Sequence, residues 1–358
     1  MQGAFLPEWI GAGIALAVLF AFSYIQIRHF GLAAAAALAP LPGYLLAVAL
    51  HASSQPLGYV CGFAVAIILL SVMKTQICDG ASPANATREA IRSVGAALFW
   101  SLTLVIAAMA VFSAVGGGVA ALMASLTVLL CGLSALAITV LMARFFAYDD
   151  EFIARANRLR ERRERWLDGL AFVVQPRWGW SVSGVALIFA VLGIFGGQDS
   201  GATWPFSVLS AEGVLFAVLA YAATRNMRRT IAVLLTVAVL VCLASWVRAR
   251  LAIGGQELVL AIAVGAAPAL IMAIQSASFA RGGDAVAVSG LRATEQLAIP
   301  IVFFSAASSI ALLPLGAFAG AVLTALGGVA ALIVFPALTT AIYDLFPPRV
   351  SLDAYRIR

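Results

Sequence analysis

A chain of 358 residues that is 63% hydrophobic and 11% charged has too few polar side chains to cover the surface of a soluble protein. Its apolar residues gather in runs long enough to cross a bilayer, and no polar run between them is long enough for a separate soluble domain. The net charge of +6 is spread over the loops, which suits contact with anionic lipid rather than with nucleic acid. The composition therefore predicts one helical membrane domain with no nucleic-acid partner.

The apolar runs predict an all-α polytopic membrane protein with about eleven transmembrane helices, because an unpaired backbone is too costly in hydrocarbon. In chain order, the expected spans are Trp9–Ile27, Leu32–Leu50, Leu57–Met73, Gly95–Ser113, Val119–Met142, Trp178–Phe195, Val208–Ala223, Thr230–Val247, Leu258–Ser276, Leu297–Leu313 and Gly316–Ile342. The first run has the acidic Glu8 before it and no clear cleavage site, so we expect a span rather than a removable signal peptide.

The basic residues between the spans predict the orientation of the chain. When loops are assigned alternately to the two sides, every Lys and Arg except Arg248 and Arg250 falls on one side. The positive-inside rule then predicts an external N-terminus and a cytoplasmic C-terminus. Lys74 is the single lysine in an Ala-rich, Arg-rich chain, a composition typical of a high-GC bacterial genome. We therefore expect a bacterial inner membrane.

A charged segment separates the fifth and sixth spans. It begins with Asp149, Asp150 and Glu151 and continues with arginines among apolar residues, a pattern that partly suits an amphipathic helix on the cytoplasmic face. Two interpretations stay open, which are contact with lipid head groups and a solvated linker whose charges only set the orientation. The candidates for head-group contact are Arg155, Arg158, Arg162, Arg163 and Arg165.

The two halves on either side of this segment share one plan. In each, a span ends in basic residues, a return span and a third span follow, and a loop with two arginines leads into a tight helical hairpin. The hairpins turn at Gly116–Gly118 and at Leu313–Gly316. The order predicts two parallel five-helix repeats and one linking span. The expected divisions are 1–146 (first repeat), 147–177 (cytoplasmic linker helix), 178–207 (linking span and short external loop), 208–346 (second repeat) and 347–358 (cytoplasmic tail).

A family resemblance is clearest from Asp284 to Phe346. That stretch contains a loop with Ala285, Ala287 and Gly290, and then the runs Ala306-Ala307-Ser308-Ser309-Ile310-Ala311-Leu312-Leu313-Pro314, Gly316-Ala317-Phe318-Ala319-Gly320, Ala325-Leu326-Gly327 and Phe335-Pro336-Ala337-Leu338. A fainter version runs from Thr87 to Phe146. On these residues the chain resembles the transmembrane core of the RND superfamily, especially its MMPL-type lipid exporters and sterol-sensing relatives. The resemblance implies a protein that binds or moves a hydrophobic molecule such as a lipid.

Three departures from that family affect the expected mechanism. Compared with the family, we expect the opening span, which would precede Trp9, to be missing and the large external domains to be reduced to residues 196–205, with a partner protein to supply them. Proton-driven members carry a carboxylate at the middle of the fourth span of each half. Here Ala267 stands where that acid is expected, and the first-half counterpart Gly62–Ile68 has none. The resemblance therefore implies no proton relay of the usual kind.

Four residues are candidates for a substrate site. Pro268 interrupts the backbone hydrogen bonds of its span, so Gly265 and Pro268 could form the wall of a cavity, or the proline could be a purely structural kink. Glu212 lies about one turn inside the seventh span and Glu295 at the inner end of the tenth. Each could bind a cation or a polar lipid head, or could snorkel to the interface.

Catalytic and metal-binding clusters are not expected. His29 and His51, the two histidines, fall on opposite faces in the predicted topology and so cannot share a metal. The cysteines Cys61, Cys78, Cys131 and Cys242 show no metal-site spacing. The sequence thus predicts no enzyme, no metal and no cofactor. Two hypotheses follow, which are an RND-like protein that binds or moves a lipid and a non-catalytic accessory subunit of a larger membrane complex.

Overall fold

The computed structural model describes residues 8–50, 56–146, 148, 151–154, 180–186, 188, 206–251, 255–282 and 286–346. Within these residues the fold has twelve α-helices, two short π-helical segments and no strand. Nine helical segments of this part are long and apolar enough to cross a membrane, as expected for a multi-pass membrane protein. The predicted tail 347–358, most of the sixth span and the linker arginines Arg155, Arg158, Arg162, Arg163 and Arg165 lie outside the described residues.

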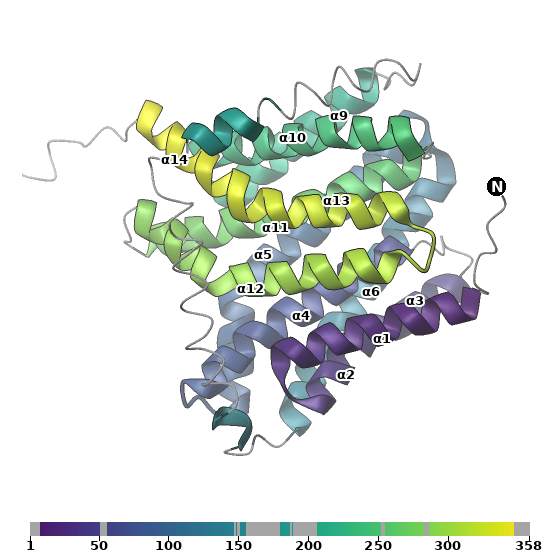
Figure 1. Cartoon of the computed structure of the whole chain (residues 1–358), viewed down its shortest axis with the longest axis vertical. Helices are drawn as coiled ribbons and strands as arrows, with labels where there is room; N and C mark the ends of the chain where they lie inside the picture. The colour runs from purple at the N-terminus through teal and green to yellow at the C-terminus, as the bar shows by residue number, and fades with distance from the viewer. Residues whose placement is uncertain are drawn as a thin grey trace, which may run out of the picture.

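The helices of the two halves lie side by side, the first half mostly low and the second half mostly high in the view of Figure 1. The first half contains α1 (Glu8–Ile27), α2 (Phe30–Leu38), α3 (Leu41–Ala49), α4 (Pro56–Cys78), α5 (Pro83–Phe112) and α6 (Gly118–Phe145). The second half contains α9 (Phe206–Thr224), α10 (Met227–Leu251), α11 (Gly255–Arg281), α12 (Val286–Leu312), α13 (Phe318–Val329) and α14 (Phe335–Leu345).

Two expected spans are not single α-helices. The second span is broken between α2 and α3, where Pro40 and Pro42 have no N–H to donate to the preceding turn. The last span contains a π-helical segment, Ala330–Val334, directly before Pro336. A wider turn is a common way to continue a helix past a missing hydrogen bond. The expected hairpin turns are both present, with Gly118 and Gly316 at positive φ angles of 65° and 75°.

The helix contacts of the two halves correspond. In each half the third membrane span packs against the fifth, α4 against α6 and α11 against α13. Across the halves α1 packs against α12 while α9 packs against α5, and α4 packs against α12 while α11 packs against α5. These reciprocal contacts are those of two copies of one unit related by an approximate twofold axis, which passes between α4 and α11.

The turn after the first helix repeats in detail. Arg28 and Arg225 both adopt left-handed backbone conformations, with φ of 62° and 50°, which are uncommon for residues other than glycine. The next residue caps the following helix in both halves. His29 Nδ1 accepts a hydrogen bond from the Leu32 N–H, and Asn226 Oδ1 accepts one from the Arg229 N–H. Leu32 and Arg229 are therefore equivalent positions.

We call the end of the bundle where α1 and α9 finish the basic end, because Arg28, Lys74, Arg144, Arg225 and Arg281 lie on helix ends or turns there. It is the end predicted to face the cytoplasm. Arg248 and Arg250 belong to the opposite end of α10. The described helices run alternately toward and away from the basic end. Their order thus agrees with the sequence-based assignment of loops to two sides, which separates these two arginines from the other cations.

Glycines bring the third membrane span of each half against the fifth span of the same half. A Cβ on Gly62 of α4 would lie 2.7 Å from the Cys131 carbonyl oxygen of α6. A Cβ on Gly265 of α11 would lie 2.7 Å from the Leu323 carbonyl oxygen of α13. Backbones approach this closely in membrane proteins only where the side chain is absent or very small. These two glycines therefore hold equivalent contacts in the two halves.

We predict that Gly265→Ala destabilises the protein by about 1–3 kcal/mol, because the added methyl group forces α11 and α13 apart. Gly13→Ala is the matched control, since a Cβ on Gly13 of α1 meets nothing within 4 Å. The control should be neutral or slightly stabilising. Thermal unfolding in detergent, followed by tryptophan fluorescence, measures both, and equal midpoints for the two variants would contradict the prediction.

Candidate functional site

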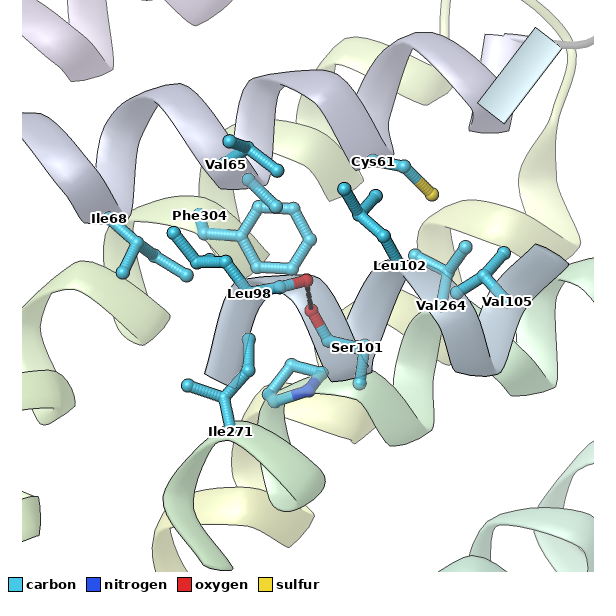
Figure 2. Close-up of a pocket in the computed structure, with 13 residues that line it drawn as sticks. Cys61, Val65, Ile68, Leu98, Ser101, Leu102, Val105, Val264, Ile271 and Phe304 are labelled. Atoms are coloured by element: carbon cyan, nitrogen blue, oxygen red, sulfur yellow. Dashed lines mark hydrogen bonds between the residues drawn. The ribbon is translucent and has the colours of Figure 1, made fainter. Parts of the chain in front are cut away.

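A small cavity of about 20 Å³ lies between α4 and α11, the two most enclosed of the described helices. In both α4 and α11, 89% of the span is buried inside the protein. Figure 2 shows side chains that line the cavity. They are Cys61, Ala64, Val65 and Ile68 of α4, Leu98, Ser101, Leu102 and Val105 of α5, Val264, Ala267, Pro268 and Ile271 of α11, and Phe304 of α12.

The lining of this central cavity is apolar. Its one hydroxyl, Ser101 Oγ, donates a hydrogen bond of 2.8 Å to the Leu98 carbonyl oxygen of its own helix (Figure 2). The space suffices for about one water molecule, and a site of this size without polar partners stays dry. Ala267, which occupies the position where the family resemblance implies an acid, is among the lining residues. No carboxylate is among them, so this lining offers no acid to load a proton.

The structure separates two of the substrate-site candidates. Pro268 lines the central cavity, and α11 continues through it without a break in the helix. Gly265, three residues earlier, is turned toward α13, where its backbone meets Gly327. Gly265 therefore serves helix packing. Contact of Gly265 or Pro268 with a substrate stays a prediction.

The carboxyl group of Glu212 lies inside the bundle. Both of its oxygens are buried and have no hydrogen-bond partner among the described residues. Glu212 lies about 18 Å from the turn Arg225–Asn226, at a rise of 1.5 Å per residue along α9. It is therefore at the same height in the bundle as Val239 of α10. That depth is within the hydrocarbon region, which is about 30 Å thick. Glu295 is instead exposed on α12.

Polar contacts that the sequence did not reveal lie toward the basic end. Gln275 of α11 donates to Gln296 of α12 at 2.7 Å, and Gln296 donates to Ser93 of α5 at 2.8 Å, which joins the two halves. Arg229 of α10 is 2% exposed. The expected spans left Arg229 in the loop between Ala223 and Thr230. Its burial could have been predicted from its position three residues after the capping Asn226, because Leu32 follows the capping His29 at the same distance.

Metal-binding groups do not gather in the part of the chain that the structure describes. Within those residues there is no cluster of three or more His, Cys, Asp or Glu side chains with the proximity needed to hold a metal ion. Cys61 and Cys131 are buried, and Cys78 and Cys242 are half-buried. The expectations of no metal and no enzyme thus stay predictions for the whole chain.

No protein-family model matches the chain, and no curated protein matches its sequence. Among solved structures it is similar to SecDF, in a crystal structure described as the super-membrane-facing form, with a TM-score of 0.67. The chain has the transmembrane fold of SecDF. The match extends over 94% of this chain and 62% of the SecDF chain at 11% sequence identity.

This likeness to SecDF confirms the expected RND-related transmembrane fold. An identity of 11% establishes the fold alone, and the chain spans less than two thirds of the SecDF chain. The finer assignment to MMPL-type proteins and the lipid substrate stay predictions. Fold by itself does not determine the substrate, because sites of different chemistry occur on one fold.

We predict that Glu212→Leu raises the stability of the protein by about 1–3 kcal/mol, because it removes a buried polar group that has no partner. Glu295→Leu, on the exposed surface of α12, should change it by less than about 0.5 kcal/mol. Thermal unfolding in the same detergent measures both. A loss of stability in Glu212→Leu, but not in Glu295→Leu, would mean instead that the carboxyl group binds a cation or a side chain outside the described residues.

Proposed function

We propose that this protein is an RND-type protein of a bacterial inner membrane that binds or moves a hydrophobic molecule, a lipid, between its two halves. The observation that carries this proposal is the apolar central cavity between α4 and α11, at the junction of the halves in a SecDF-like fold. In our proposal the N-terminus is external, the C-terminus is cytoplasmic, and the protein performs no enzymatic reaction and needs no cofactor or metal.

The cavity as it stands is too small for a lipid, so the proposed cargo enters when the halves separate. The contacts of α4 with α12 and of α11 with α5 are the ones that would slide. Rocking of one repeat against the other is a common way for transporters of duplicated structure to expose a central site. Because no carboxylate is among the lining residues, we propose that this movement does not depend on the usual proton relay.

Cys61 offers an intrinsic reporter of that separation, since it lines the cavity and is 5% exposed. The test variant retains Cys61 and replaces Cys78, Cys131 and Cys242 by Ala. We expect N-ethylmaleimide to label Cys61 several-fold faster in phosphatidylethanolamine–phosphatidylglycerol vesicles than in lipid-free detergent. A matched variant that retains only Cys131, a buried thiol of α6 that does not line the cavity, should show no such difference. Equal, slow labelling of Cys61 in both media would contradict the lipid proposal.

The alternative is a non-catalytic accessory subunit that holds a larger membrane complex together. The observation that favours it is the small size of the central cavity, which has room for about one water molecule and for no cargo as it stands. In that case the central cavity is a packing defect, and the protein's function depends on its partner.

Mass spectrometry of the protein in polymer-extracted membrane discs separates the two proposals. Enrichment of one lipid over the bulk membrane, without a stoichiometric protein, supports lipid binding, whereas a stoichiometric protein and no lipid enrichment support the accessory subunit. Ala267→Phe, which fills the central cavity, should abolish the lipid enrichment. Ala96→Phe, on the exposed face of α5, is the control and should leave it unchanged.

A further inference from the structure

Arg229 is a buried cation with no anion beside it among the residues that the structure describes. It lies three residues after the capping Asn226, in the first turn of α10, and is 2% exposed. One guanidinium nitrogen, Nη2, donates to Ser289 Oγ of α12 at 3.0 Å, while the buried Nε has no hydrogen-bond partner within the same residues. A guanidinium removed from water costs several kcal/mol unless an anion or a full set of acceptors compensates it.

The neighbours of Arg229 add positive charge and hydroxyl groups. Arg281, exposed at the end of α11, lies close enough for its charge to act on the Arg229 guanidinium. Ser289 Oγ is 3.5 Å from Ser276 Oγ of α11. Within the described residues no carboxylate is found in contact with Arg229. Two cations and two hydroxyl groups therefore converge from α10, α11 and α12.

Contacts between the turn before α10 and the end of α14 lie beside this cluster. Asn226 Nδ2 donates to the Tyr343 hydroxyl at 3.0 Å, and the Arg228 guanidinium lies 5.1 Å from the centre of the Tyr343 ring. Both contacts hold the start of α10 against the end of α14. The turn between α9 and α10 is thus fixed in place, and Arg229 is oriented by it.

The first half shows that the fold does not need a charge here. Its equivalent residue, Leu32, also follows a capping residue by three positions and is fully buried. A leucine is therefore compatible with this backbone and this degree of burial. The cation at Arg229 is a feature of the second half alone, which argues for binding rather than for folding.

We propose that Arg229, Arg281, Ser276 and Ser289 form a binding site for a phosphate group. A guanidinium donates to phosphate oxygens in a fixed fork, and serine hydroxyl groups complete such a shell. The site lies at the basic end, which is predicted to face the cytoplasm, and basic pockets between helices on that side suit anionic lipid head groups. The phosphate belongs to a membrane lipid or is free in solution. This site is separate from the central cavity.

The test measures the thermal stability of the full-length protein in detergent with added short-chain phosphatidylglycerol or with added inorganic phosphate. We expect a rise in the melting temperature of the wild type that saturates with ligand. In Arg229→Leu, which copies the first half, the rise should vanish, while the ligand-free melting temperature should equal or exceed that of the wild type. Arg281→Gln should weaken the apparent affinity, and Arg225→Gln, an exposed neighbour with the same loss of charge, should not.

The outcomes are distinguishable. A response to phosphatidylglycerol but not to inorganic phosphate identifies the lipid as the source of the group, and the opposite result identifies free phosphate. An unchanged response of Arg229→Leu, or no response of the wild type to either probe, overturns the proposal. A lower ligand-free melting temperature in Arg229→Leu also overturns it, because the guanidinium would then serve the fold. None of these results depends on Cys61 labelling, which tests the central cavity.

Discussion

The rest of the structure depends on one kind of contact, which joins α4 to α6 in the first half and α11 to α13 in the second. Inside a bilayer the hydrophobic effect does not hold helices together, so they must pack closely. Gly62 admits the backbone of α6, and Gly265 admits that of α13. Because α4 and α11 are held at this distance from their partners, their remaining faces meet α5 and α12 of the opposite halves. The central cavity is the space left where those faces do not fit completely.

The two halves share a backbone plan but differ in their ionisable groups. The left-handed arginine, the capping residue and the glycine contact occur in both. By contrast, the buried Arg229 corresponds to the buried Leu32. Counted from the same turn, the buried carboxyl group of Glu212 corresponds to Ala15, which is 6% exposed. A duplicated scaffold can tolerate such groups in one copy while the other copy keeps the apolar packing.

Much of the fold could be predicted from local patterns, and the exceptions have physical causes. The turn at Leu313–Gly316 followed from its Pro and Gly residues, and the positive φ of Gly316 agrees with that prediction. The break at Pro40 was missed, because a proline pair within an apolar run leaves the run equally hydrophobic. The burial of both Glu212 oxygens could not be predicted, because it depends on which side of α9 faces the neighbouring helices.

The sequence by itself determined that this is a membrane protein of many helices, with its cations gathered at one end, because hydrophobicity and charge are properties of each segment. It also placed Ala267 where an acid was expected. The tertiary structure alone decided which face of each helix is enclosed. Pro268 faces the central cavity while Gly265 faces α13, and Arg229 is buried while Arg281 is exposed. Those differences depend on helix rotation, which is set by contacts with residues far away along the chain.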